Sequence, residues 1–164
     1  MTEKRPDSAA RRLERFPPFQ LLGIRVLELD EDWRKVRILL PLNADNRNPG
    51  GSMFGGSIAS LADPIPALAC HGSFPQFAVW TRELQVDFRS PGLSDLELRF
   101  ELTEAAVGAI AEELAKRGRS TPSFEFGFYD QEGQSGGLGK KPGSTAPPGC
   151  FYPNCRCSTS QEMM

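Results

Sequence analysis

Apolar and polar residues alternate along several short segments of the chain, as they do in strands that bury one face. The clearest example places Leu96, Leu98, Phe100 and Leu102 between Glu97, Arg99 and Glu101. Similar segments lie at 22–29, 35–40, 77–88 and 124–128, and acidic or glycine-containing turns close several of them. These segments predict antiparallel strands with one buried face.

A different spacing, of three and four residues, predicts a helix after the first two strands. The apolar positions are Ile58, Leu61, Ala62, Ile65, Leu68 and Ala69. Asp63 lies off this stripe, among small residues, so another surface could pack close to it. Pro64 follows it and should kink the helix there; the alternative is that the helix is broken at this point. From spacing alone, Asp63 could equally be a solvated surface acid.

The order of these elements favours an α+β fold. Two strands precede one long helix, and a run of antiparallel strands follows it, which suits a sheet wrapped around the helix rather than alternating βαβ units. A second helix is predicted over 103–117, with Thr103 as its cap and Gly118 at its end.

The richest chemistry lies in residues 48–63, around the start of the long helix. Asn48 and Gly51 precede the glycine pair Gly55 and Gly56, and Asp63 follows. Glycines let backbone approach a ligand closely because they carry no Cβ. A helix that begins here directs its free N–H groups and positive dipole end at an anion, or at an oxygen that becomes anionic in a reaction.

These residues resemble the signature of the hotdog-fold thioesterases, in the branch similar to phenylacetate-pathway and acyl-CoA thioesterases. That signature reads Asn-x-x-Gly-x-x-His-Gly-Gly, followed by a helix that carries Leu-Ala-Asp. The residues that match without a gap are Asn48, Gly51, Gly55, Gly56, Leu61, Ala62 and Asp63. The resemblance covers about residues 19–130 and continues through residues 79–81 and 87–92.

The resemblance implies a role for each matched residue. Asp63 would be the general base or nucleophile, the Gly55 N–H would polarise the thioester carbonyl, and Asn48, from the opposite subunit, would position the carbonyl or a water. Thr81 falls where some members hold a water, and together with Gly56 and Phe54 it would contact substrate. Phe54 departs from the family, which often has His there, so the polar network is thinner.

The implied activity is hydrolysis of an acyl thioester of coenzyme A or of acyl carrier protein, at the interface of a homodimer or homotetramer, without a cofactor. One alternative is a non-catalytic acyl-binding protein on the same fold, which Phe54 favours. A dehydratase or hydratase ranks last, because the sole histidine, His71, follows the helix rather than facing Asp63.

Composition narrows the partners. A net charge of −2 over 164 residues indicates neither a nucleic-acid footprint nor a membrane-attracting surface. The first residues, charged and without an apolar segment, predict no secretory signal, so the expected compartment is the cytoplasm. Cys70 is expected to be a buried small side chain. Cys150, Cys155 and Cys157 lack zinc-site spacing, so no metal site is expected.

The chain divides into three parts on this reading. Residues 1–18 form a polar arm, 19–134 the hotdog domain, and 135–164 a tail rich in Gly, Pro, Ser and Thr. The tail has no apolar periodicity and is predicted to be disordered. Because the family would place one more strand here, the last strand of the sheet is expected to be missing or altered.

Overall fold

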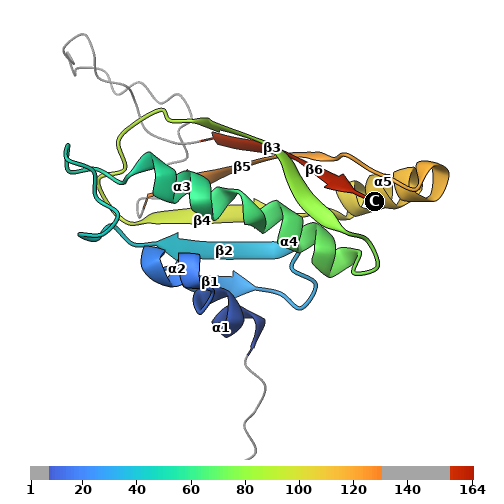
Figure 1. Ribbon diagram of the computed structural model, residues 1–164, viewed down its shortest axis with the longest axis horizontal. Coiled ribbons are helices and arrows are strands. Elements are labelled where there is room, and N and C mark those ends of the chain that lie inside the picture. The colour runs from blue at the N-terminus through green and yellow to red at the C-terminus, as the bar shows by residue number, and fades with distance from the viewer. Residues whose placement is uncertain (1–7, 131–155) are drawn as a thin grey trace, which may run out of the picture.

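The computed structural model describes residues 8–130 and 156–164 (Figure 1). In chain order the elements are α1 (Ala9–Glu14), α2 (Pro17–Leu22), β1 (Arg25–Leu29), β2 (Lys35–Leu40), α3 (Gly55–Ala62), α4 (Pro64–Ser73), β3 (Val79–Asp87), β4 (Leu96–Glu101), α5 (Glu104–Arg117), β5 (Ser123–Tyr129) and β6 (Arg156–Met163).

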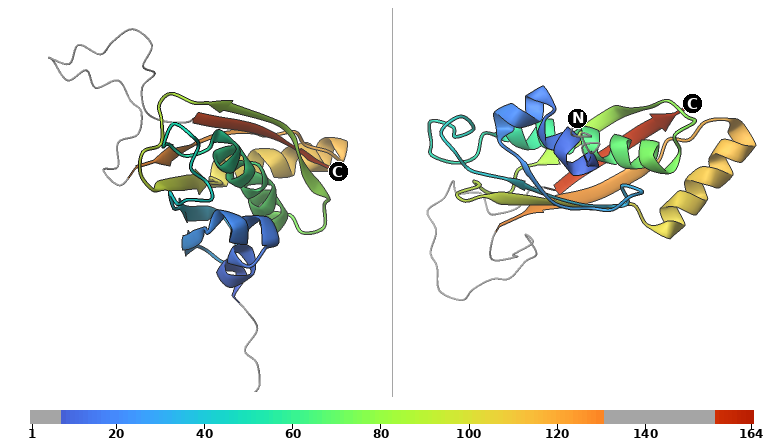
Figure 2. Two further views of the ribbon diagram at one scale, coloured as in Figure 1. Left: turned by 60° about the vertical axis from the view of Figure 1, so that its left-hand side comes forward. Right: turned by 90° about the horizontal axis from the view of Figure 1, so that it is seen from below.

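The strands form one antiparallel sheet in the order β1-β2-β4-β5-β6-β3. The sheet curves around α3 and α4, which cross one of its faces, while α1 and α2 lie beside β1 (Figures 1 and 2). The fold is therefore the expected α+β hotdog arrangement. β1 and β3 are the two edge strands, so each has one side of its backbone unpaired within the described sheet.

The core lies between the helices and the concave face of the sheet. The predicted helical stripe is buried at Ile58, Leu61, Ala62, Ile65 and Ala69. The alternating residues of β2 and β4 meet it from the sheet, and Ile38 and Leu98 pair directly across these strands. The two periodicities thus identified the two faces that pack together.

The long helix is broken at Asp63, which was the alternative considered for the proline pair. Pro64 and Pro66 have no N–H to donate to the carbonyls of Ser60 and Ala62, so two main-chain hydrogen bonds of a continuous helix cannot form. Asp63 keeps right-handed helical angles, with φ −54° and ψ −54°, and serves as both the last cap of α3 and the first cap of α4. The apolar stripe therefore continues from one helix into the next.

The expectation that the last strand is missing was wrong. β6 fills the gap between β5 and β3, and Thr81 pairs with Gln161 while Ser123 pairs with Ser160. Strand pairing uses backbone groups that every non-proline residue carries, so two neighbouring strands can hold a third whose side chains are mostly polar. Residues 131–155, which include most of the predicted tail, lie outside the described residues.

The arm predicted over residues 1–18 contains a helix. Ser8 caps α1 by accepting from the Arg11 N–H, Leu13 is buried in the core, and Glu14 accepts from the backbone N–H of Val26 at 2.8 Å. The charged composition hid this element, because one buried leucine is too weak a signal for a helix of this length. The predicted second helix is confirmed as α5: the Thr103 hydroxyl accepts from Ala106 N–H, and Gly118 ends it at φ +68°.

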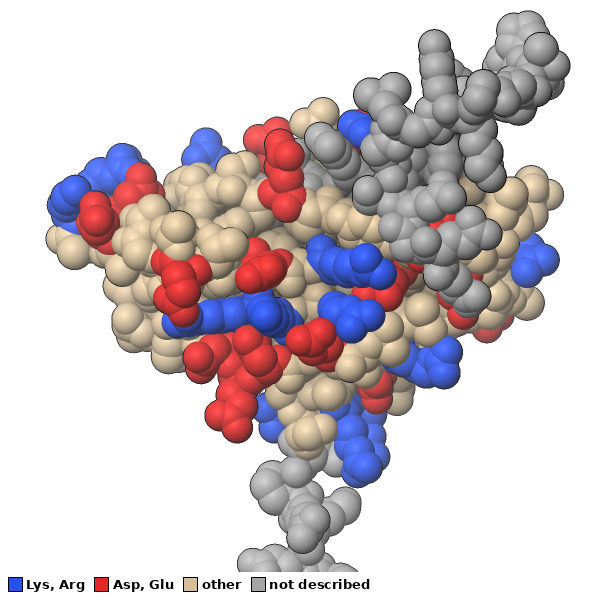
Figure 3. Space-filling view, turned by 180° about the vertical axis from the view of Figure 1, so that it is seen from behind, with Lys and Arg blue, Asp and Glu red and all other residues tan. Residues whose placement is uncertain are grey.

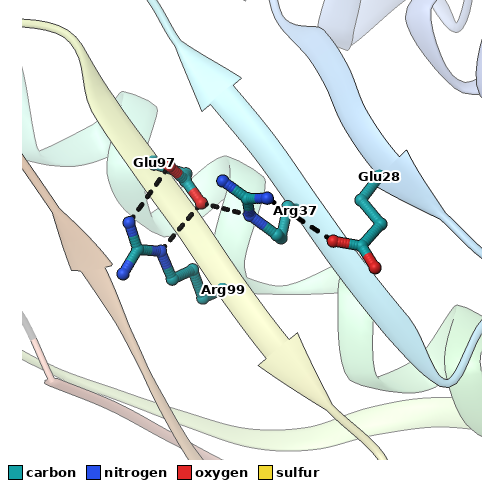
Figure 4. A network of polar contacts seen from close by, with 4 residues as sticks. All are labelled: Glu28, Arg37, Glu97 and Arg99. Carbon is teal, nitrogen blue, oxygen red and sulfur yellow. Dashed lines mark hydrogen bonds and ion pairs between the residues drawn. The ribbon is translucent and has the colours of Figure 1, made fainter. Parts of the chain in front are cut away.

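The convex face of the sheet, turned away from α3 and α4, carries interspersed charges (Figure 3). At its centre Glu97 accepts from Arg37 at 2.6 Å and from Arg99 at 2.8 Å, and Arg37 also reaches Glu28 at 3.5 Å (Figure 4). The guanidinium of Arg99 lies 4.5 Å from the centre of the Tyr129 ring. This network joins β1, β2, β4 and β5 through side chains.

Replacement of Glu97 by Gln should lower stability at neutral pH and remove part of its pH dependence. Hydrogen bonds from Arg99 and Arg37 lower the pKa of Glu97 from 4.5 to about 2, and its side chain is only 14 % exposed. A lowered carboxyl pKa stabilises the fold above pH 4.5, and this contribution is lost as the pH falls towards 2. We expect about 1–2 kcal/mol, because solvent screens the half-exposed guanidiniums.

The measurement is urea unfolding at several pH values between 3 and 7. Glu101→Gln, at an exposed position on the same strand, is the matched control and should change little. Equal pH dependence for Glu97→Gln and the unaltered protein would contradict the assignment.

Candidate functional site

The turn that leads into α3 is anchored on two sides. Asn46 is buried, and its side-chain amide donates to the Pro41 carbonyl at 2.6 Å. The N–H of Phe54 donates to the Asn46 carbonyl at 2.7 Å, and the N–H of Met53 donates to the Gly92 carbonyl at 2.8 Å. The two residues just before α3 are therefore held by contacts with both the β2–α3 and the β3–β4 connections.

Asn48 closes the tip of this turn. Its Nδ2 donates to Ser52 Oγ at 2.8 Å, its Oδ1 accepts from Ser52 N–H at 3.1 Å, and its backbone pairs with Ser52 as well. Gly51 adopts φ +84°, which a residue with a Cβ rarely adopts. A carboxamide has two N–H donors, so one remains for a further partner. A shallow open hollow lies beside the turn, lined by Ala44, Arg47, Asn48 and Pro49.

The first turn of α3 has no side-chain cap, because Phe54 occupies the cap position. The N–H groups at the helix start therefore lack the acceptor that Ser, Asp or Asn would supply there. The Phe88 ring lies over Gly55, within 3.0 Å of where a Cβ would stand, and the Phe54 ring folds over Gly56. A Cβ at either position would press on these exposed rings, which would have to turn aside.

Asp63 stands at the opposite end of α3 with its side chain exposed. The Thr81 hydroxyl, on β3, donates to the backbone carbonyl of Asp63 at 2.9 Å. This bond joins the break between α3 and α4 to the edge strand, so it fixes the orientation of the residue that carries the carboxylate. The structure thus brings together Thr81 and Asp63, which are 18 residues apart in the sequence.

The structure does not bring Asp63 to Gly55 within one protomer. Eight residues of helix separate them, which corresponds to about 12 Å along the axis. A thioester carbonyl cannot touch both at once. The expected site residues therefore form two half-sites, with Asn48, Phe54, Gly55 and Gly56 at the start of α3, and Asp63 and Thr81 at its end.

Cys70 and His71 lie away from both half-sites, at the end of α4. Cys70 is buried as expected, and burial raises the pKa of its thiol to about 12, so it is not a nucleophile near neutral pH. His71 is exposed in the last turn of α4. It does not face Asp63, and this agrees with the low rank of the dehydratase interpretation.

Sequence reasoning missed two residues of the first half-site. Asn46 lies two residues before Asn48, but its role depends on bonds to the backbone of Pro41 and Phe54, which residue spacing does not reveal. Phe88 continues the alternation of Leu84 and Val86, which predicts a buried face, so no signal in the sequence indicated that its ring is half exposed beside Gly55.

Within the described residues, no helix combines the length and apolar character needed to cross a membrane. No curated protein matches the chain. Among solved structures, the chain is similar to a protein of unknown function from Pseudomonas aeruginosa, described as a probable thioesterase. The two share 21% sequence identity and a TM-score of 0.73 over 94% of this chain and 92% of that one.

Two further structures support the same fold. The E. coli PaaI protein, from the phenylacetic acid degradation operon, shares 17% identity and a TM-score of 0.60, with 95% of this chain and 90% of that chain covered. A thioesterase from Haemophilus influenzae shares 15% identity and a TM-score of 0.62, covering 100% and 95%. The resemblance to hotdog-fold thioesterases is confirmed at the level of the fold.

A family model matches residues 9–138, which is most of the chain and includes both half-sites. The chain belongs to the family described as a domain of unknown function, DUF4442.

Proposed function

We propose that the protein hydrolyses acyl thioesters at a site assembled from two protomers. The observation that carries the proposal is the separation of the half-sites: an uncapped helix start at Gly55, and an exposed carboxylate at Asp63 whose backbone Thr81 holds. Two copies can bring the helix start of one against the carboxylate of the other. The structural neighbours described as thioesterases support this class of reaction.

In the proposed reaction, the thioester carbonyl oxygen lies against the Gly55 N–H. The partial positive charge of the α3 start stabilises the oxyanion that forms when the carbonyl carbon is attacked. Asp63 of the other protomer either takes a proton from the water that attacks the carbonyl carbon, or attacks that carbon itself. In the second case the acyl group forms a mixed anhydride with the Asp63 carboxyl, and water then hydrolyses this intermediate. The C–S bond breaks, the thiolate leaves and takes a proton, and a carboxylic acid results.

Asn48 and Thr81 complete this arrangement. Asn48 has one amide donor left after binding Ser52, and it positions the carbonyl or the water. Thr81 orients the Asp63 backbone and offers its hydroxyl oxygen as an acceptor to the water. The carrier of the acyl group is coenzyme A or acyl carrier protein, and the cytoplasm is the proposed compartment.

The edge strand β3 is the proposed meeting surface of the two protomers. It is nine residues long, is paired only with β6 within the described sheet, and carries the exposed Trp80 next to Thr81. An unpaired edge of this length is a template for another strand. Pairing there would place the Thr81–Asp63 unit at the interface, as the proposal requires.

The protein should therefore sediment as a dimer or larger assembly at micromolar concentration. Thr81→Pro would remove a backbone donor from the edge strand, whereas Leu27→Pro would do the same on the other edge, β1. We expect the first to reduce association by tenfold or more and the second to leave it unchanged. A monomer for the unaltered protein would contradict the shared site.

The activity is tested by release of free thiol from acetyl-, butyryl-, hexanoyl- and octanoyl-CoA, and from octanoyl acyl carrier protein. Turnover well above the uncatalysed rate supports the proposal. A folded dimer that releases no thiol from any of these would overturn it.

A second candidate is an acyl-binding protein without turnover. Phe54 favours this function, because it stands where the thioesterases that the chain resembles often have His. Its ring and the Phe88 ring cover the first turn of α3 with apolar surface. Tight binding of octanoyl-CoA without release of thiol would identify this function.

A further inference from the structure

Three large apolar side chains are exposed at the start of α3 and in the β3–β4 connection that contacts it. Phe54, Phe88 and Leu93 are 57 %, 49 % and 71 % exposed. Single exposed apolar residues are ordinary, but a cluster of them at one place indicates a surface that binds something apolar.

Two of these side chains cover the first turn of α3, and a backbone hydrogen bond brings the segment of the third close to it. The Phe88 ring lies over Gly55 and the Phe54 ring over Gly56. Leu93 directly follows Gly92, whose carbonyl accepts from the N–H of Met53, the residue before Phe54. The apolar cluster and the proposed carbonyl-binding N–H groups are therefore the same place in the fold.

The charged neighbours of this cluster neutralise one another. Arg89 donates from Nε to Asp87 at 2.7 Å, on either side of Phe88 in the sequence. A guanidinium that is already paired with a carboxylate attracts a negatively charged ligand less strongly than an unpaired guanidinium does. The surface between the two rings therefore suits an uncharged group.

We infer that Phe54, Phe88 and Leu93 are specificity-determining residues that bind the acyl part of the substrate, and that they select extended apolar acyl groups over acetyl. This rests on the proposed function, because the acyl chain is bonded to the carbonyl carbon that Gly55 polarises. The first carbons of the chain must lie within a few bond lengths of that carbonyl. The two rings are the apolar surface within that reach.

The selectivity follows from burial of methylene groups. Each methylene removed from water between apolar side chains improves binding by about fourfold. The increase in kcat/KM from acetyl-CoA to octanoyl-CoA therefore depends on how many methylene groups of the acyl chain the rings cover. The rise should level off once the chain extends past the apolar side chains.

The experiment measures kcat/KM for acetyl-, butyryl-, hexanoyl- and octanoyl-CoA with the unaltered protein and with Phe54→His, Phe88→Ala and Phe88→Leu. Phe54→His keeps a ring but makes it polar, and Phe88→Leu keeps apolar bulk where Phe88→Ala could disturb the loop. We expect the octanoyl-to-acetyl ratio to fall by tenfold or more in Phe88→Ala and Phe54→His, and less in Phe88→Leu. Leu27→Ala, an exposed apolar residue on the opposite edge of the sheet, should keep the ratio unchanged.

Binding separates this inference from the proposed function. The thioether analogues of acetyl- and octanoyl-CoA cannot be hydrolysed, and calorimetry gives their Kd for each protein. If no thioester is hydrolysed but the octanoyl analogue binds more tightly than the acetyl analogue, and the variants lose this difference, the apolar acyl site stands and the proposed hydrolysis fails.

Two results would overturn the inference. One is a kcat/KM, or a Kd for the analogues, that is independent of acyl length in the unaltered protein. The other is an unchanged octanoyl-to-acetyl ratio in Phe88→Ala and Phe54→His proteins that still sediment as dimers.

Discussion

Asp63→Ala should lower kcat for thioester hydrolysis by a thousandfold or more while the protein stays folded. A positioned general base contributes about 10²–10⁴ in rate, and a nucleophile whose loss ends the covalent pathway contributes at least as much. The carboxylate is exposed and lies off the apolar stripe, so alanine opens no cavity in the core. Alanine at position 63 also keeps the backbone N–H that donates to the Ala59 carbonyl.

Asp63→Asn sharpens this prediction. The amide keeps the shape of the side chain and removes only its charge and basicity, so binding of the octanoyl-CoA thioether should be retained within a few-fold. Asp32→Ala, at an exposed acid in the β1–β2 turn, is the matched control and should hydrolyse thioesters like the unaltered protein. Full activity in Asp63→Ala would mean that the carboxylate is a surface group and that the assigned half-site is wrong.

Gly55→Val should reduce kcat/KM by about a hundredfold, close to the effect of losing one donor to the oxyanion. The new Cβ would stand 3.0 Å from the tip of the Phe88 ring, and a branched side chain would crowd the backbone where the proposed carbonyl binds. The ring can turn aside, because it is half exposed, so the fold should survive. The damage falls on access of the carbonyl to the helix start rather than on the core.

Gly108→Val separates this effect from helix propensity. Gly108 lies in α5, where a Cβ would have no neighbour within 4 Å. Valine is a better helix former than glycine, so neither substitution should lower stability through propensity. The measurements are thermal melting and thiol release. Comparable activity of Gly55→Val and Gly108→Val would show that the start of α3 does not take part in the reaction.

Local patterns were sufficient where one residue spacing decided one buried face. The three-and-four spacing of Ile58, Leu61 and Ile65 and the alternation of Leu96 and Leu98 predicted the surfaces that pack in the core. Thr103 and Gly118 predicted both ends of α5, since caps depend on neighbouring backbone only. These predictions needed no knowledge of distant contacts.

Patterns failed where the partner is distant. β6 is held by pairing with β3 and β5, and its own sequence does not alternate between apolar and polar residues as the others do. α1 depends on burial of Leu13 and on the bond from Val26 N–H to Glu14. In both, tertiary contacts supply the stabilisation that intrinsic propensity lacks.

For the candidate site, the sequence by itself determined the chemical groups: a glycine pair at a helix start, an amide before it and a carboxylate one helix later. Only the tertiary structure decided which of them meet. It placed Thr81 on Asp63, turned Asn48 onto Ser52, and brought the Phe88 ring over Gly55. The physical reason is that helix rise fixes the distance between Gly55 and Asp63, whereas the contacts of β3 and its flanking loop depend on how the whole sheet curves around α3 and α4.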